Sequence, residues 1–145
     1  MRAHDFILRL DHDRIVAAIK AAETKTSGEI RVFIHRGELA DDALQHAQRK
    51  FAKLGMQKTK ERNGVLIFVA PRAQKFAVIG DEAVHARCGE VFWQQLVGSM
   101  REHFQRENFT EALVLAINQT ADLLATHFPR SAGDKNELSD EIVEG

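Results

Sequence analysis

The chain has 145 residues, of which 44% are hydrophobic and 28% are charged, and its formal net charge is -1. This length and composition predict one globular domain with a single core. The nearly neutral charge argues against a general nucleic-acid binder, which carries a clear basic excess. Cys88 is the single cysteine, so no disulfide can form within the chain, and this fits a reducing compartment.

The N-terminus does not have the pattern of a secretory signal. Residues 1–6 contain no apolar run followed by a small-residue cleavage site. The longest apolar run, over residues 65–71, has the length of a strand and is far shorter than the roughly 18 to 20 apolar residues of a membrane helix. We therefore expect a cytoplasmic protein with no direct membrane anchor.

The first part of the chain alternates between helical and extended patterns. Apolar residues at helical spacing predict a helix over residues 11–26. Alternation of apolar and polar residues over 29–35 predicts a strand with one dominant apolar face. A second helix is predicted over 41–54, with Asp41 as its N-cap and Leu44 on its apolar face.

Two apolar runs in the middle of the chain predict a β-hairpin. Residues 64–70 are continuously apolar, which is typical of a strand that is buried on both faces. Residues 75–80 follow after the short turn 71–74, so we expect the two strands to pair in antiparallel. Asn63-Gly64, at the start of the hairpin, is interpreted as a turn because both residue types tolerate positive φ angles.

The C-terminal part is predicted to be mainly helical. One broad apolar face predicts a helix over 90–105, and a last helix is predicted over 109–127 with Asn108 as its N-cap. Pro129 ends this helix, because the residue before a proline avoids the helical region. Residues 130–145 are polar and acidic and are interpreted as a flexible tail.

The predicted order of elements is α-β-α-β-β-α-α. The strand–helix–strand unit over 29–70 implies a parallel crossover, and the hairpin adds an antiparallel strand. Helices on both faces would cover this sheet. The predicted fold class is therefore α/β: a single-domain α/β/α sandwich with a small mixed sheet. It spans residues 11–129 and follows an N-terminal segment, residues 1–10.

Several candidate site residues should meet at one edge of the predicted sheet. Neighbouring parallel strands begin at the same edge, and an antiparallel strand ends there, which places Glu29, Asn63 and Gly80 together. Asp81 and Glu82 follow directly after Gly80. The carboxylates at this edge would repel one another unless a cation, an arginine or helix N–H groups neutralised them.

Two alternatives for these carboxylates remain open. Glu29, Asp81 and Glu82 offer the oxygen ligands that Ca²⁺ or Mg²⁺ prefer, which predicts a divalent-cation site. Alternatively, Arg62 forms a salt bridge with them, or Asp81 and Glu82 cap the helix that follows.

Three motifs, in this order, resemble the TPM domain family, which includes a thylakoid-lumen acid-phosphatase-like protein of photosystem II repair. They are Thr26-Ser27-Gly28-Glu29-Ile30, Arg62-Asn63-Gly64-Val65-Leu66-Ile67 and Lys75-Phe76-Ala77-Val78-Ile79-Gly80. The first is similar to the entry into the family's first strand, and the other two are similar to the two strands that follow. The resemblance covers about residues 11 to 127.

The resemblance implies an α/β/α sandwich with a mixed sheet, in agreement with the reading from periodicity. Members of the family are linked to phosphatase activity, to divalent-cation binding and to the maintenance of membrane proteins. The residues of this chain that match the family pattern are Glu29, Asn63, Gly64 and Gly80. The resemblance therefore carries a site onto these residues.

Two classes of function follow. The first is a binding or accessory module whose strand-end loops contact a protein partner, with or without a bound cation. The alternative is a metal-assisted phosphatase, in which Asp81 and Glu82 hold the ion and Arg62 or Arg72 binds the phosphate. The sequence displays no complete set of nucleophile and base, and this favours the binding module.

Overall fold

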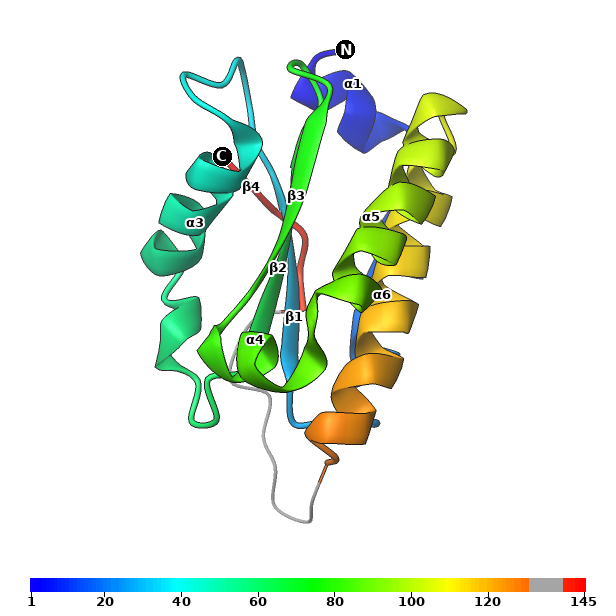
Figure 1. The fold of residues 1–145 in the computed structure, drawn as a ribbon. Helices are drawn as coiled ribbons and strands as arrows, with labels where there is room; N and C mark the ends of the chain where they lie inside the picture. The colour runs from blue at the N-terminus through cyan, green and yellow to red at the C-terminus, as the bar shows by residue number, and fades with distance from the viewer. Residues whose placement is uncertain (131–139) are drawn as a thin grey trace.

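The computed structural model describes residues 1–130 and 140–145. Within these residues, a mixed sheet with the strand order β3-β2-β1-β4 lies between two layers of helices (Figure 1). The strands are β1 (Glu29–Ile34), β2 (Gly64–Ala70), β3 (Lys75–Gly80) and β4 (Val143–Glu144). The helices are α1 (Ala3–Leu8), α2 (His12–Glu23), α3 (Ala43–Lys53), the 3₁₀ helix η1 (Met56–Lys58), α4 (Glu82–Cys88), α5 (Glu90–Gln105) and α6 (Phe109–His127).

The centre of the sheet has the topology that the sequence predicted. β1 and β2 pair in parallel, and β2 and β3 pair in antiparallel across the hairpin. Every residue of β2 is buried, as the continuous apolar run indicated. The α/β/α sandwich with a mixed sheet is therefore confirmed.

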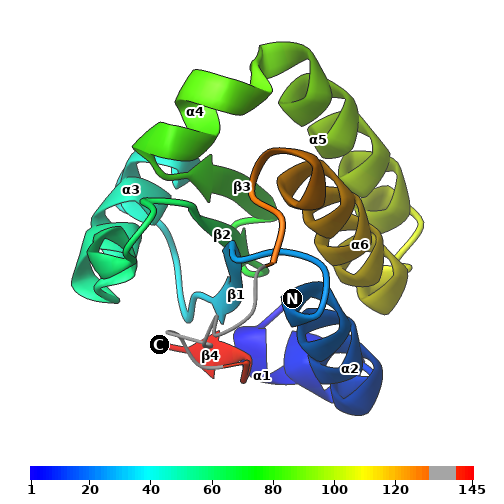
Figure 2. The ribbon, with the colours of Figure 1, turned by 90° about the horizontal axis from the view of Figure 1, so that it is seen from below.

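Two separate cores explain why β2 has no polar side. α3 and η1 cover one face of the sheet, and α2, α5 and α6 cover the other face (Figure 2). The side chains of β2 alternate between the two cores because successive residues of a strand point to opposite faces. Those in the larger core, under α2, α5 and α6, are Val65, Ile67 and Val69. Those in the smaller core, under α3, are Leu66, Phe68 and Ala70.

The N-cap of α3 differs from the prediction. Asp42 caps this helix by accepting from the backbone N–H of Gln45 at 2.8 Å. Asp41 is instead held by Arg49, with 2.6 Å between Nη1 and Oδ2. The N-cap therefore lies one residue later than expected. Leu44 is 52% exposed rather than part of the apolar face.

Two further end effects escaped the sequence patterns. The N-terminal segment contains α1, whose Phe6 is only 2% exposed and lies 4.8 Å from Phe109 between ring centroids. This helix is too short to show a clear helical period. Asn108 precedes α6 as predicted, but its side chain makes no capping hydrogen bond.

The C-terminus adds β4 to the sheet as an outer strand beside β1. Phe33 of β1 lies opposite Val143 in a parallel register. The backbone N–H of Gly145 then donates to the carbonyl of Ile34 at 3.1 Å. Val143 packs against the smaller core. A strand of two residues carries no readable alternation, so only this non-local pairing reveals it.

This strand corrects part of the predicted flexible tail over 130–145. Residues 143–144 are paired in the sheet, whereas residues 131–139 of that prediction lie outside the described residues. In the part of the chain that the structure describes, no helix is long and apolar enough to cross a membrane.

Gly80 provides a test of the packing between β3 and α4. A Cβ atom at this position would lie 2.8 Å from Cγ1 of Val84, whereas a Cβ at Gly98 in α5 would meet nothing within 4 Å. We expect Gly80→Ala to lower the free energy of unfolding by about 1–3 kcal/mol through overpacking. Gly98→Ala should raise it by about 0.5–1 kcal/mol. Urea unfolding of both variants measures this, and equal midpoints would contradict the close packing at Gly80.

Candidate functional site

The candidate site is the edge of the sheet where β1 and β2 begin and β3 ends. In the ladders, Glu29 lies opposite Gly64, and Val65 lies opposite Gly80. The backbone N–H of Asp81 donates to the carbonyl of Gly64 at 2.9 Å. The strand pairing therefore brings the predicted residues together at one edge. We call this region the Arg62 edge; it comprises Glu29, Arg62, Asn63, Gly64, Gly80, Asp81 and Glu82.

Arg62 connects the two acidic residues that follow β3. Its Nε donates to Oδ2 of Asp81 and its Nη2 donates to Oδ1, both at 2.8 Å, in a bidentate pair. Its Nη1 lies 2.8 Å from Oε1 of Glu82. The hydrogen bond with Asp81 is the main cause that raises the pKa of the Arg62 guanidinium above its ordinary value. Of the two alternatives from the sequence, the salt bridge is the arrangement observed.

Asp81 also caps α4. Its Oδ1 accepts from the backbone N–H of Glu82 at 2.8 Å, and its side chain is only 5% exposed. The carboxylate thus accepts from two N–H groups of Arg62 and one of the helix. The Asp81 carboxylate thus both caps α4 and pairs with Arg62. The two roles are compatible because a helix N-terminus and a guanidinium each stabilise a negative charge.

The three predicted cation ligands are not grouped around one point in the structure. Within residues 1–130 and 140–145, no three His, Cys, Asp or Glu side chains are placed to hold a metal ion. Asp81 and Glu82 face Arg62, and Glu29 is buried with 4% exposure. The Ca²⁺ or Mg²⁺ ligation by these three residues stays a prediction.

The interpretation of Asn63-Gly64 as a turn is corrected by the backbone. The positive φ lies one residue earlier, at Arg62, with a value of 53°. Asn63 is 1% exposed, and its N–H donates to Oγ1 of Thr59 at 3.3 Å. Gly64 is the first residue of β2, and a Cβ there would lie 3.3 Å from the carbonyl oxygen of Met56. Glycine therefore serves close packing at this position rather than a left-handed turn.

Two polar side chains beside this pair, Ser27 and Glu61, were missed by sequence reasoning, and they contact the predicted Asn63. The hydroxyl of Ser27 donates to Oε2 of Glu61. Nδ2 of Asn63 donates to Oγ of Ser27 at 3.2 Å and to Oε2 of Glu61 at 3.0 Å. We call these residues the Ser27 group. The signal was available, since Ser27 and Glu61 each stand just before a strand, and neighbouring parallel strands begin at the same edge.

Arg72 does not belong to this site. It lies in the turn between β2 and β3, at the opposite edge of the sheet, and its Nε is 3.9 Å from Oε1 of Glu38. Antiparallel strands that end at the Arg62 edge must turn at the other edge, which separates the two arginines. Of the two arginines predicted to bind phosphate, Arg62 alone lies beside Asp81 and Glu82.

A histidine pair lies at this opposite edge. The ring centroids of His35, after β1, and His46, on α3, are 4.4 Å apart, and both rings contact Phe68. Burial lowers the pKa of His46, and the nearby His35 and Arg49 lower it further against the opposing effect of Asp41. The neutral imidazole is thus the form that suits this packing.

The comparisons with known proteins agree with the observed fold. The model of the TPM domain matches residues 3–123, so the chain belongs to the TPM domain family. The structure is also similar to the NMR structure of the BA42 protein from the psychrophilic bacterium Bizionia argentinensis. The TM-score is 0.86 and the sequence identity 34%, over 94% of this chain and 96% of that chain. Among curated proteins, no match was found.

A matched pair of caps tests the role of Asp81. Asp42 caps α3 and is exposed, whereas Asp81 caps α4, is buried and also pairs with Arg62. We expect Asp42→Ala to lower the free energy of unfolding by about 1 kcal/mol, as for an ordinary N-cap. Asp81→Ala should lower it by about 2–3 kcal/mol, since a charge-assisted bidentate pair is lost as well. Urea unfolding gives both values, and equal losses would show that the ion pair adds nothing.

The histidine pair predicts a dependence of stability on pH. Because the pKa of His46 is lower in the folded state than in the unfolded state, the unfolded chain takes up the proton first. The contribution of His46 to the free energy of unfolding is therefore fully present above the ordinary histidine pKa of about 6.5. It falls as the pH drops below that value. We expect His46→Gln to lose less stability than the wild type between pH 8 and pH 5. Parallel losses in urea unfolding at the two pH values would contradict this.

Proposed function

We propose that this TPM domain is a binding or accessory module, and that its working surface is the Arg62 edge with the Ser27 group. The observation that carries the proposal is that the Asp81 carboxylate already accepts from Arg62 and from the start of α4. A buried carboxylate that accepts from three N–H groups holds the surrounding loops in place. Three of its roughly four acceptor sites are already used, which favours a positioning role over catalysis.

The exposed part of this edge has the chemistry of a protein-binding surface. The side chain of Glu82 is 68% exposed and that of Arg62 is 42% exposed. Ser27 is half-buried and Glu61 is exposed beside them. Charges of both signs, held by mutual hydrogen bonds, suit a polar protein partner and lower the ordering cost of binding. A nucleic acid would require a basic excess, and the formal net charge of the chain is -1.

Charge reversal at the edge tests this proposal. Immobilised wild-type protein should retain from a lysate a partner that Glu82→Lys no longer retains. Glu90→Lys is the matched control, because Glu90 is also an exposed glutamate in the first turn of a helix but lies outside the edge. Identical retained proteins for all three forms would contradict the assignment of the surface.

A cytoplasmic location stays a prediction.

The alternative function is a phosphatase acting on phosphoesters. The observation in its favour is the hydroxyl of Ser27 donating to the carboxylate of Glu61, since an adjacent base is one way to activate a nucleophile. Arg62 lies at the same edge and would supply the guanidinium that binds the phosphate. Hydrolysis of p-nitrophenyl phosphate, with and without Mg²⁺ or Ca²⁺, tests this activity. Hydrolysis by the wild type that is lost in both Ser27→Ala and Asp81→Ala, with folding intact, would reverse our order of preference.

A divalent cation at this edge would have to compete with Arg62 for Asp81 and Glu82. Removal of the guanidinium in Arg62→Gln should therefore strengthen Ca²⁺ binding relative to the wild type, because the carboxylates lose their cationic partner. The measurement is a Ca²⁺ titration that follows the amide signals of residues 28–30, 62–64 and 80–83. If no signal moves at millimolar Ca²⁺ in either protein, the cation prediction is wrong.

A further inference from the structure

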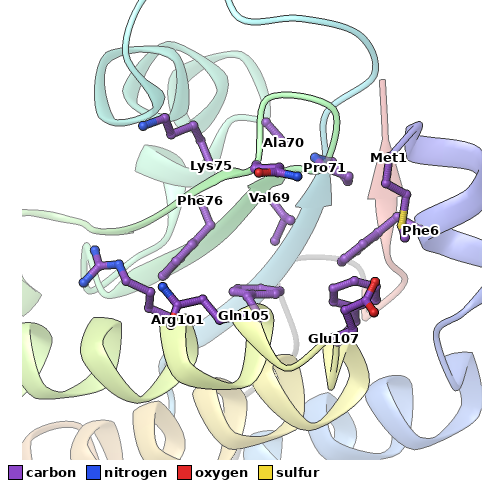
Figure 3. A pocket seen from close by; sticks show the side chains of 13 residues that line it. Met1, Phe6, Val69, Ala70, Pro71, Lys75, Phe76, Arg101, Gln105 and Glu107 are labelled. Carbon is purple, nitrogen blue, oxygen red and sulfur yellow. The ribbon is translucent and has the colours of Figure 1, made fainter.

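A second concave feature lies far from the Arg62 edge. A pocket of about 680 Å³ opens between α1, the turn of the β2–β3 hairpin and the junction of α5 with α6 (Figure 3). Its volume is within the range of roughly 300–1,000 Å³ that is usual for small-molecule sites. Its apolar walls include the side chains of Phe6, Val69, Pro71, Phe76, Phe104 and Phe109.

The phenylalanines form one continuous aromatic wall. The ring centroids of Phe76 and Phe104 are 4.9 Å apart, and those of Phe104 and Phe109 are 6.3 Å apart. Phe6 continues the wall, 4.8 Å from Phe109. Phe76, Phe104 and Phe109 are only half-buried, although they belong to regular elements that face the core. An apolar ligand would therefore remove aromatic surface from water without any rearrangement of the core.

The two ends of the pocket differ in charge. Arg101 lies beside Phe76 at one end, whereas Met1 and Phe6 close the other end (Figure 3). Glu107 lies near Phe6, and its charge is balanced by Arg9 at 3.1 Å. Within residues 1–130 and 140–145, Arg101 has no carboxylate partner, and it is exposed to solvent. The pocket thus combines an apolar interior with an uncompensated guanidinium at an accessible end.

We propose that this pocket binds an amphipathic monocarboxylic acid. Its hydrocarbon part would lie against the aromatic wall, and its carboxylate would pair with Arg101. The planar guanidinium can donate to both oxygens of a carboxylate at once. A neutral or cationic head group cannot form this charge-assisted bidentate pair. This site does not involve the Arg62 edge, so the proposal goes beyond the function proposed above and its test is independent of it.

Titrations with three small probes test the proposal through backbone amide signals. Octanoate should shift the signals of residues 69–76 and 101–109 in a saturable manner. Acetate, which has the charge without the chain, should not shift them. Octan-1-ol, which has the chain without the charge, should bind the same residues more weakly, by about fivefold, because an exposed ion pair contributes modestly. Absence of shifts with octanoate at millimolar concentration would overturn the site.

Substitutions on α5 separate the charge from the cavity. Arg101→Gln should weaken octanoate by about fivefold and leave octan-1-ol unchanged. Arg106→Gln is the control, since Arg106 is an exposed arginine that does not line the pocket. Gln105→Trp places a large side chain at the exposed wall of the pocket and should abolish binding of both probes. Equal binding of octanoate and octan-1-ol, with no effect of Arg101→Gln, would overturn the carboxylate assignment.

Discussion

The structure depends on the burial of β2 on both of its faces. This strand occupies the middle of the sheet and has β1 in parallel on one side and β3 in antiparallel on the other. Its side chains alternate between two cores, so each layer of helices is anchored to the same seven residues. A shift of its register by one residue would exchange the contents of the two cores. Backbone hydrogen bonds fix the registers of β1 and β3 relative to β2. These registers then set which residues lie together where the strands begin and end.

The Arg62 edge is a direct consequence of that register. The start of β2 sets the position of Arg62, and the end of β3 sets the position of Asp81. The ladder brings the two together, and the bidentate pair then fixes the loops on either side. Because the carboxylate of Asp81 is buried, loss of its partner would leave a costly uncompensated charge. This explains why an acidic residue at a strand end serves here to hold the edge together.

The two ends of the sandwich offer different chemistry to ligands. The Arg62 edge is polar, cross-linked by hydrogen bonds and charged with both signs. The opposite end has an aromatic pocket with one accessible guanidinium. A partner protein at one end and a small amphipathic anion at the other would contact separate elements of the fold. The structural similarity to BA42 covers 94% of the chain and so includes elements of both ends.

Patterns of local sequence determined most of the regular elements and the edge at which the candidate site residues meet. Periods of two and 3.6 residues reveal which faces are apolar, and the rule that parallel strands start together placed Glu29, Asn63 and Gly80 correctly. Short or non-local features were beyond these patterns. α1 and β4 are too brief to show a period, and the cap of α3 depended on whether Asp41 or Asp42 was held by Arg49.

The pairing of Asp81 and Glu82 with Arg62, and the separation of Arg72 from them, are seen only in the tertiary structure. Side-chain partners depend on distances across the sheet, and the linear sequence does not contain those distances until the register of β2 is set.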